Sequence, residues 1–332
     1  MQVAIIGAGS WGTALGIMAA RKGHDVRLWA RRTEVAQRIE AERENALYLP
    51  GHQLPRRLRA TDDLEEALRD AEMVIYASPS HAARDFARAA RRWLVPGAVL
   101  VSAAKGIEGG TGARVSDVFA AELEERAARV VALSGPSFAR EVVAGHPTAI
   151  VAAGRSLDEA RRVQWALSYE NLRIYANDDL TGTEMGGAVK NVIALAAGMV
   201  VGLGLGANSL AALITRGLAE MTRLAVAAGA RLESMLGLAG VGDLVLTCTS
   251  EQSRNRRVGR ELGRGRRLEE VLSEMHEVVE GVRTTPAVRL LAARCGVRMP
   301  ITDAVHAVLY EGCEAQRAVA ELMARPLRDE FD

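Results

Sequence analysis

Short apolar runs alternate with helical patterns along the first half of the chain. Seven runs have the length and continuous apolar character of buried strands, at residues 3–6, 26–30, 73–77, 98–103, 130–133, 148–152 and 172–175. Apolar residues at helical spacing fill most of the segments between these runs. Strands that alternate with helices favour an α/β fold built on a doubly wound sheet.

Capping residues indicate where helices begin in this half. Thr33 is expected to cap a polar helix over 33–43, and Thr61 to cap a short acidic helix over 61–69. The hydroxyl of such a residue accepts a backbone N–H of the first turn. Ser78-Pro79-Ser80 opens a further helix, because proline is tolerated in a first turn, where its missing N–H has no partner to lose.

The strand pattern disappears at about residue 179, and the rest of the chain is typical of helices. We expect helices through Lys190, over 208–228 and 251–262, from Thr285-Pro286 to Cys295, and after a cap at Thr302. The sequence therefore predicts two domains, residues 1–178 around the sheet and residues 179–332 entirely helical, in keeping with a length beyond one average core.

Val192 to Thr215 carries no charged side chain and is long enough to cross a bilayer. Four glycines interrupt it, at residues 198, 202, 204 and 206. A spanning helix is usually more uniformly apolar. We therefore expect two buried helices joined by a glycine-rich turn, and no membrane span.

A glycine motif joins the first predicted strand to the first predicted helix. Gly7, Gly9 and Gly12 have the G-x-G-x-x-G spacing of dinucleotide-binding sites. The first glycine permits a tight turn, the second lets backbone approach a diphosphate, and the third lets helix and strand pack closely. The helix start offers free N–H donors to that anion. Residues 1–178 are thus expected to form a Rossmann-type dinucleotide-binding domain.

Two arginines follow the second predicted strand, where an NAD-preferring site has an acidic residue for the ribose 2′-hydroxyl. Arg31 and Arg32 at this place favour use of NADP(H). The alternative is that both are ordinary surface arginines. The cofactor is therefore expected to be NADP(H) or NAD(H), without a preference being fixed.

Composition excludes several classes of protein. A net charge of +1 and 49% hydrophobic residues are typical of a globular protein without a nucleic-acid-binding or anionic-membrane surface made by bulk charge. Cys248, Cys295 and Cys313 form no C-x-x-C pair, and the histidines are scattered, so neither disulfides nor a metal site is expected. The amino terminus lacks the features of a secretory signal, so we expect a cytoplasmic protein.

Lysine is rare in this chain. Of the 42 basic residues only Lys22, Lys105 and Lys190 are lysines, which leaves 42 − 3 = 39 arginines. Lysine can lose its proton when its pKa is lowered, whereas arginine stays charged. Lys105 follows a predicted strand at the carboxyl edge of the sheet, where ligands bind in such folds. Proton transfer is therefore a hypothesis for Lys105 and Lys190.

The segment 249–257 starts a predicted helix with several arginines. Cations at a helix N-terminus oppose the helix dipole. The arrangement is favourable where an anion binds, and otherwise it is a basic solvated face. The residues alone leave both open.

These features together resemble the bacterial-type NAD(P)-dependent glycerol-3-phosphate dehydrogenases. The matching stretches cover nearly the whole length: Gly7–Ala14, Asn45–Gly51, Lys105–Glu108, Leu133–Val142, Glu184–Gly198, Ala211–Thr222, Gly237–Thr249, Ser253–Gly259 and Glu280–Val282. The resemblance implies reversible reduction of dihydroxyacetone phosphate to sn-glycerol 3-phosphate for phospholipid synthesis. It implies this small molecule as partner and allows a homodimer.

The resemblance also assigns site residues. Lys190 is similar to the family's proton donor and acceptor, Lys105 to its second lysine, and Asp243 to the acid that orients Lys190. The implied substrate site is Lys105, Gly135, Ser137, Lys190, Asp243, Ser253, Arg254 and Asn255. The implied cofactor site is Gly7, Gly9, Ser10, Trp11, Gly12, Arg31, Arg32, Lys105, Ala139, Arg254, Val278 and Glu280.

The chain departs from the family pattern where Val201 and the uncharged Gly206–Leu210 replace charged residues. These departures concern a domain or subunit contact and no catalytic role. Two other functions stay open at this stage. One is a related dehydrogenase of a 3-hydroxy acid, and the other is a cofactor-sensing module without catalysis.

Overall fold

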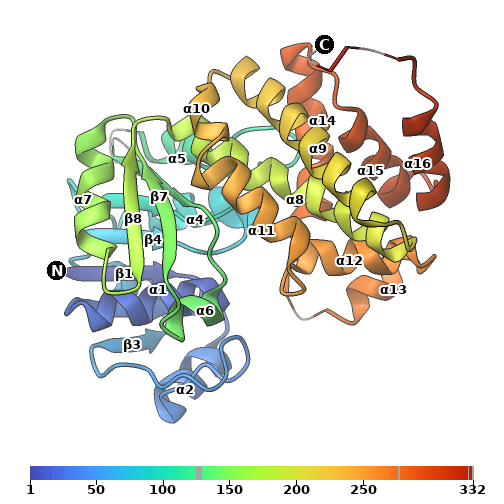
Figure 1. The fold of residues 1–332 in the computed structure, drawn as a ribbon. Coiled ribbons are helices and arrows are strands. Elements are labelled where there is room, and N and C mark those ends of the chain that lie inside the picture. Colours follow the sequence, from blue (N-terminus) through green and yellow to red (C-terminus); the bar gives the residue numbers. More distant parts are fainter. Residues whose placement is uncertain (125–128, 276, 328, 331–332) are drawn as a thin grey trace.

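One eight-stranded sheet forms the N-terminal half of the computed structural model, which describes residues 1–124, 129–275, 277–327 and 329–330 (Figure 1). Its strands lie in the order β3-β2-β1-β4-β5-β6-β7-β8. Their bounds are β1 Gln2–Ile6, β2 Asp25–Trp29, β3 Leu58–Thr61, β4 Met73–Tyr76, β5 Val99–Ser102, β6 Val130–Ser134, β7 Thr148–Ala153 and β8 Leu172–Asn177. All neighbours are parallel except β6 and β7. The predicted doubly wound α/β fold is confirmed, with a reversal of direction at the last two strands.

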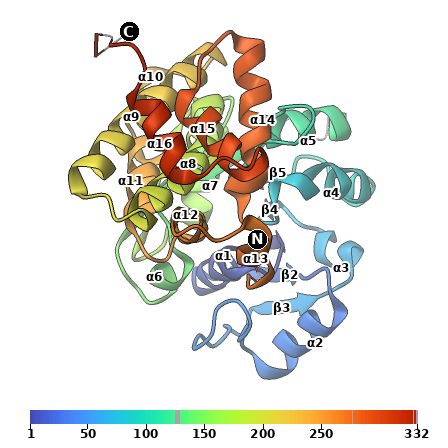
Figure 2. The ribbon, with the colours of Figure 1, turned by 90° about the vertical axis from the view of Figure 1, so that its right-hand side faces the viewer.

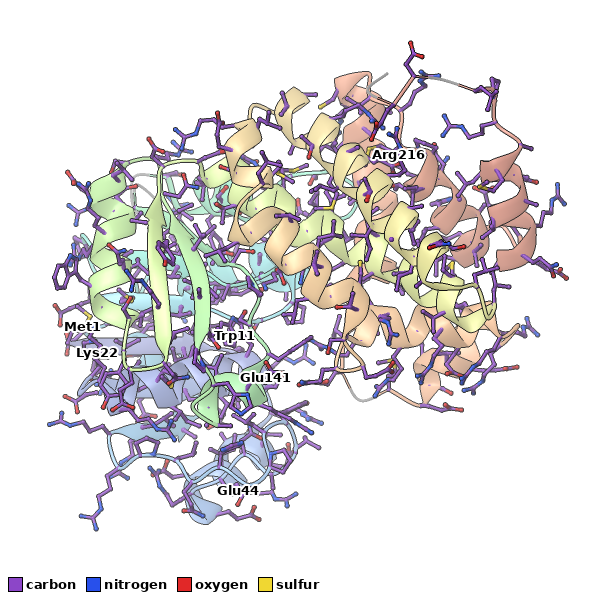
Figure 3. The ribbon with its side chains drawn as sticks, viewed as in Figure 1. Met1, Trp11, Lys22, Glu44, Glu141 and Arg216 are labelled. Atoms are coloured by element: carbon purple, nitrogen blue, oxygen red, sulfur yellow. The ribbon has the colours of Figure 1, made fainter. Side chains whose placement is uncertain are left out.

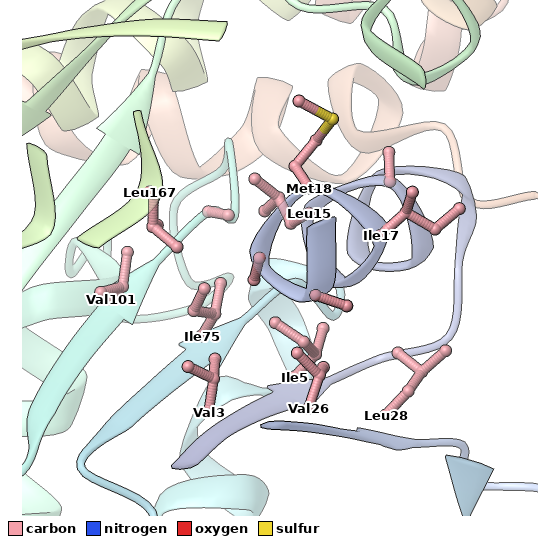
Figure 4. Packing of buried hydrophobic residues seen from close by; sticks show 14 of the residues in the cluster. Val3, Ile5, Leu15, Ile17, Met18, Val26, Leu28, Ile75, Val101 and Leu167 are labelled. Carbon is pink, nitrogen blue, oxygen red and sulfur yellow. The ribbon is translucent and has the colours of Figure 1, made fainter. Parts of the chain in front are cut away.

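Helices cover both faces of the sheet because alternate strand residues point to opposite sides. Val3 and Ile5 of β1 belong to one apolar cluster, which α1 joins through Leu15 (Figure 4). Ala4 and Ile6 belong to the cluster on the other face, where α4 and α5 pack together (Figure 2). The N-terminal helices are α1 Ser10–Arg21, α2 Thr33–Glu42, α3 Leu64–Leu68, η1 Ser80–Ala82, α4 Ala83–Ala90, α5 Val115–Leu123, α6 Ala139–Val143 and α7 Leu157–Leu167.

The described chain after β8 contains helices and no strand. Its core is α8, which the other helices surround (Figures 1 and 2). The elements are α8 Leu180–Gly202, α9 Ala207–Ala227, α10 Leu232–Met235, η3 Leu238–Gly242, α11 Asp243–Thr249, α12 Arg254–Gly263, α13 Leu268–Ser273, α14 Glu280–Cys295, α15 Pro300–Tyr310 and α16 Ala315–Met323.

Glycines let α8 and α12 pack with their backbones in close contact. A Cβ on Gly198 would lie 2.1 Å from the Arg256 carbonyl oxygen, and one on Gly259 would lie 1.9 Å from the Leu195 carbonyl oxygen. Any side chain at either place would force the helices apart. This close approach fixes α12, and therefore its first residue Arg254, relative to α8.

The uncharged segment 192–215 forms the second half of α8, a turn and the start of α9, as predicted. The α8 part is buried, whereas the first turns of α9 are largely exposed. By length and composition, two stretches of the described chain could cross a membrane, 180–202 and 232–249, and in an 18-residue window of each, 89% and 44% of the residues respectively are buried inside the protein. Such burial of α8 is typical of a core helix.

Strand β3 was not predicted from the sequence, and the helix cap beside it lies at another residue than predicted. Thr61 is the last residue of β3, which pairs with β2, and does not begin a helix. Asp63 caps α3 instead, with its carboxylate accepting the N–H groups of Glu65 and Glu66. The Thr61 hydroxyl donates to the Glu66 carboxylate and accepts the N–H of Asp63, which precedes the helix.

Three other predicted helix starts are also corrected. Thr33 lies inside α2, whose N-cap is Arg32. The predicted helix at Thr285-Pro286 begins earlier, with Pro286 inside α14. Proline there removes the N–H that would bond to the Val282 carbonyl oxygen, and the Tyr310 hydroxyl donates to that oxygen at 2.6 Å.

The last predicted cap, at Thr302, lies in the first turn of α15, which starts at Pro300. The Glu220 carboxylate of α9 accepts the N–H groups of Ile301 and Thr302 at 2.8 and 2.9 Å. A buried side chain from another helix therefore caps α15.

Candidate active site

Three charged side chains from three elements meet where the two halves of the chain join. The Asp243 carboxylate accepts the Lys190 ammonium on Oδ1 at 2.6 Å and the Lys105 ammonium on Oδ2 at 2.8 Å. Asp243 and Lys190 are buried, with 1% and 7% of their side chains exposed, and Lys105 is 18% exposed. The structure thus brings together the two lysines and the acid that the sequence analysis singled out.

The fold explains this meeting. Lys105 follows β5 at the carboxyl edge of the sheet, Lys190 lies in the middle of α8, and Asp243 begins α11. The Lys105 ammonium also donates to the Gly135 carbonyl oxygen at 2.8 Å, just beyond β6. Two adjacent strand ends and two helices of the second half therefore enclose one small polar site.

Burial and charge shift the protonation of this cluster. Burial lowers the pKa of Lys190 to about 8, and the Lys105 ammonium lowers this pKa too, while Asp243 acts in the opposite direction. Burial alone would raise the pKa of Asp243, but the two ammonium groups outweigh it and hold that pKa below its ordinary value. Lys190 can therefore exchange a proton close to neutral pH while Asp243 stays ionised.

Thr247 is a member of this cluster that the sequence analysis missed. Its hydroxyl lies 2.7 Å from the Lys190 ammonium nitrogen and donates to the Asp243 carbonyl oxygen at 2.6 Å. The signal was present, because residues four apart on a helix lie on one face and Thr247 follows Asp243 by four. Thr247 fixes the position of the Lys190 nitrogen.

The glycine turn has the shape of a dinucleotide diphosphate site. A Cβ on Gly12 would lie 2.0 Å from the Gly7 carbonyl oxygen, while one on Gly9 would meet nothing within 4 Å. No side chain caps α1 at Gly9, so its first N–H groups are available to an anion. The buried Trp11 Nε1 has no partner in the described part of the chain. These residues fit a nicotinamide dinucleotide.

Gly9→Ala is expected to raise the dissociation constant of NADPH about tenfold while lowering stability by less than about 1 kcal/mol. The added methyl group meets no protein atom, so it occupies only the space needed by the diphosphate. Quenching of protein fluorescence by NADPH gives the affinity, and thermal denaturation gives the stability. Gly12→Ala is the matched variant and should reduce both, because its methyl group collides with Gly7. Unchanged affinity in Gly9→Ala would contradict this assignment.

The two arginines expected at the ribose end differ in their surroundings. Arg31 is exposed, and Arg32 donates to the Tyr48 hydroxyl at 3.0 Å. Tyr48 lies in the segment between α2 and β3, within the stretch Asn45–Gly51 that matches the family. The contact identifies Tyr48 as a residue that orients Arg32, and sequence spacing alone gives no signal for it.

Residues of the helical half face the glycine turn. Ser10 Oγ lies 3.4 Å from Glu277, and Arg254 donates to the Val278 carbonyl oxygen at 2.9 Å. The Glu280 carboxylate accepts the Ser80 N–H at 3.0 Å and the Ser80 hydroxyl at 2.8 Å. Of the expected cofactor residues, Glu280 therefore contacts η1, while Arg254 and Val278 lie next to Glu277, which contacts the start of α1. Ala139 begins α6 on the same half as α1.

The expected substrate residues line two sides of the same region. Ser137 donates to the Gly135 carbonyl oxygen at 3.0 Å. Ser253 caps α12, and Asn255 donates to Asn191, beside Lys190, at 2.9 Å. Asn191 in turn donates to the Lys105 carbonyl oxygen at 2.8 Å. One hydrogen-bonded chain thus links the start of α12 to both lysines.

The structure separates the arginines of segment 249–257. Arg256 forms an ion pair with Glu251, in the turn before α12, so the positive charge of Arg256 is balanced there. Arg257 is exposed, and Arg254, with 41% of its side chain exposed, lies 3.7 Å from the Glu277 carboxylate. Of these three arginines, Arg254 is the one whose side chain reaches the segment 277–278, which meets the start of α1 at Ser10. Among the residues described here, no group of three or more His, Cys, Asp or Glu side chains could hold a metal ion.

A glycine-rich dinucleotide fold with a buried lysine–carboxylate cluster at the carboxyl edge of its sheet is characteristic of nucleotide-dependent dehydrogenases with two domains. Comparison with known proteins makes this specific. Residues 2–160 match the model of the NAD-dependent glycerol-3-phosphate dehydrogenase N-terminus, and residues 179–320 match that of its C-terminus. The chain belongs to the NAD-dependent glycerol-3-phosphate dehydrogenase family, and it is an NAD(P)-dependent oxidoreductase.

Individual relatives agree over the full length. The chain is 51% identical to glycerol-3-phosphate dehydrogenase [NAD(P)+] of Citrifermentans bemidjiense, covering 99% of this chain and 98% of that protein. The crystal structure of glycerol-3-phosphate dehydrogenase from Coxiella burnetii superposes with a TM-score of 0.93 at 40% identity, covering 98% and 99% of the two chains. A ketopantoate reductase from Ralstonia eutropha shares only the fold, with a TM-score of 0.60 at 19% identity over 96% of this chain and 100% of that one.

Proposed function

We propose that this enzyme reversibly reduces dihydroxyacetone phosphate to sn-glycerol 3-phosphate with NADPH or NADH and so supplies the backbone of phospholipids. The observation that carries this proposal is the buried Lys190–Asp243–Lys105 cluster, which lies between the glycine turn and the start of α12. The relatives' printed names support the choice of substrate.

In this proposal the bound nicotinamide supplies a hydride to the carbonyl carbon of the substrate. Lys190 gives a proton to the carbonyl oxygen as negative charge develops there, and Lys105 holds the same oxygen. Asp243 keeps both ammonium groups in place through its two carboxylate oxygens. In the reverse direction the neutral Lys190 amine takes the hydroxyl proton of sn-glycerol 3-phosphate.

We assign the phosphate of the substrate to Arg254 and the backbone around it. The start of α12 at Ser253 and Asn255 offers N–H groups and polar side chains, and Gly135 and Ser137 face it from the other half. A guanidinium group binds phosphate by charge-assisted, paired hydrogen bonds. The cofactor is assigned to Gly7, Gly9, Ser10, Trp11, Gly12, Arg31, Arg32, Lys105, Ala139, Arg254, Val278 and Glu280.

Oxidation of NADPH and NADH with dihydroxyacetone phosphate, and then with 3-oxo acids, tests this function. We expect turnover with the phosphate substrate and none with the acids. Turnover with a 3-oxo acid alone would identify a 3-hydroxy acid dehydrogenase. Tight cofactor binding without turnover of either would identify a cofactor-sensing module.

Arg254→Ala is expected to raise the KM for dihydroxyacetone phosphate by about tenfold or more, since a hydrogen bond to a charged group is lost. Steady-state kinetics at saturating NADPH measures this change. Arg257→Ala is the matched control, because Arg257 is exposed on the same helix and outside the assigned site. An unchanged KM in Arg254→Ala would remove this residue from the phosphate site.

We also propose that the domains divide between residues 178 and 179, that the enzyme is cytoplasmic, and that it forms a homodimer. The last strand ends at Asn177 and α8 begins at Leu180, which supports the division. Cys248, Cys295 and Cys313 are free thiols, as a reducing compartment requires.

Exposed Leu232 and Leu236 of the helical domain favour a subunit contact. Light scattering of the purified enzyme tests the dimer, and a monomeric mass would contradict it.

A further inference from the structure

One polar contact joins the two rims of the region assigned to the substrate phosphate. The Gln252 side-chain amide donates to Glu141 Oε1 at 2.6 Å. Glu141 lies in the first turn of α6, on the side of the N-terminal half that faces the helical half (Figure 3). Gln252 lies in the turn between α11 and α12. The contact therefore spans the two halves of the chain, 111 residues apart in sequence.

Both partners lie within four residues of an assigned substrate residue. Glu141 follows Ser137 by four residues, and Gln252 directly precedes Ser253. Ser253 accepts the Arg256 N–H at 3.2 Å and so begins α12, which carries Arg254. A change in the position of Gln252 is therefore transmitted through one peptide bond to the start of that helix.

The negative charge of Glu141 lies close in sequence to the residues assigned to the substrate phosphate, so the donor that holds its carboxylate affects phosphate binding. A carboxylate beside a site for a phosphate dianion repels the ligand, and a neutral donor that holds the carboxylate leaves its charge in place but fixes its distance from the ligand. No described basic side chain forms a salt bridge of 4 Å or less with Glu141, and the donor that meets its carboxylate is the Gln252 amide. Gln252 is exposed and Glu141 is partly buried, and the hydrogen bond between them lies at the surface. An exposed contact of this kind adds little to folding stability, so its effect is local.

We propose that Glu141 and Gln252 form an interdomain clamp that positions the two rims of the phosphate site and keeps the Glu141 carboxylate engaged. The clamp rests on the proposed function, because it acts on the phosphate that this function assigns there. Glu141 and Gln252 are positioning residues that act through Ser253 and Arg254.

Gln252→Ala is expected to raise the KM for dihydroxyacetone phosphate about fivefold, with kcat and the NADPH dissociation constant within about twofold of wild type. Glu141→Gln should leave KM at or below the wild-type value, because its amide oxygen still accepts the Gln252 donor and the negative charge is gone. The double variant Glu141→Gln/Gln252→Ala should recover part of the loss, because the unengaged negative charge is gone. Steady-state kinetics and NADPH fluorescence titration give these values.

Gln316→Ala is the matched control, since Gln316 is an exposed glutamine of α16 that belongs to neither rim of the site, and it should leave every value unchanged. The clamp is wrong if Gln252→Ala leaves KM unchanged. It is also wrong if kcat, NADPH affinity and melting temperature all fall together with the rise in KM, because this pattern indicates a general structural defect. If the KM of the double variant is as high as that of Gln252→Ala, the Glu141 charge has no part in the effect and this part of the proposal is wrong.

The proposed function and the clamp can fail separately. If wild type does not turn over dihydroxyacetone phosphate, the proposed function is wrong. Calorimetric titration with inorganic phosphate then tests the clamp without turnover. Weaker phosphate binding in Gln252→Ala than in wild type supports the clamp, and equal binding contradicts it.

Discussion

Lys190→Ala is expected to lower the rate of hydride transfer by about a hundredfold or more, while the dissociation constant of NADPH stays within about twofold of wild type. In the proposed mechanism the buried Lys190 nitrogen, 2.6 Å from Asp243, supplies the proton, and its loss would leave the developing alkoxide without a donor. The cofactor is assigned to the other side of the site, so its binding does not depend on this amine. Single-turnover absorbance at the NADPH band measures the transfer.

Lys22→Ala is the matched control for this experiment. Lys22 is a lysine of the N-terminal half, and its ammonium donates to the Ser168 carbonyl oxygen at the end of α7, at 2.6 Å. Its loss should leave hydride transfer at the wild-type rate. An equal loss of hydride transfer and NADPH affinity in Lys190→Ala would instead indicate that Lys190 maintains the fold.

Asp243→Asn is expected to have the second large effect, a fall in kcat of about a hundredfold together with a lower melting temperature. The buried carboxylate holds two ammonium groups, and the amide cannot balance their charge. Asp243 raises the pKa of Lys190, so its neutralisation should shift that pKa further below about 8. The pH at which reduction declines should move downward accordingly.

Asp158→Asn on α7 is the control, because Asp158 forms an exposed ion pair with Arg161 at 3.5 Å. Such a pair contributes little to stability, so kinetics and melting should match wild type. Kinetics of Asp243→Asn equal to those of wild type would show that the carboxylate does not organise the lysines.

The apolar pattern predicted the strands of the sheet except β3, which lies at one edge. Fully buried strands such as β1 and β4 are continuous apolar runs, which the sequence displays directly. Strand β3, Leu-Arg-Ala-Thr, lies at the sheet edge and buries only its ends, so it carries no such run. Its hydroxyl-bearing last residue, Thr61, has the character of a helix cap, and only pairing with β2 decides between the two.

Tertiary contacts also decided the helix starts that the sequence misplaced. Pro286 is a local stop signal, but the Tyr310 hydroxyl compensates for the missing hydrogen bond and lets α14 continue through it. Glu220 caps α15 from another helix, so the local candidate Thr302 is not needed as an N-cap. Neither partner is near in sequence.

Site residues of a rare type could be predicted from the sequence, whereas those of a common type could not. The scarcity of lysine limited the candidate proton donors to Lys22, Lys105 and Lys190, and position along the chain favoured the last two. Asp243, by contrast, was assigned by resemblance, because one acid among many carries no signal of its own. Its position between the two ammonium groups, and that of Thr247, depends on how α11 packs against α8, which no local pattern specifies.

The central claim is that the Lys190 ammonium donates the proton in reduction. The most direct measurement is kcat/KM for dihydroxyacetone phosphate at saturating NADPH across about pH 6 to 10, which reports the ionisation of the enzyme before substrate binds. Burial lowers the pKa of Lys190 to about 8, so reduction should be constant at lower pH and decline above about 8 as the amine loses its proton. Oxidation of sn-glycerol 3-phosphate should rise over the same interval. A profile for reduction that stays level through pH 8, or that is unchanged in Lys190→Ala, would contradict the claim.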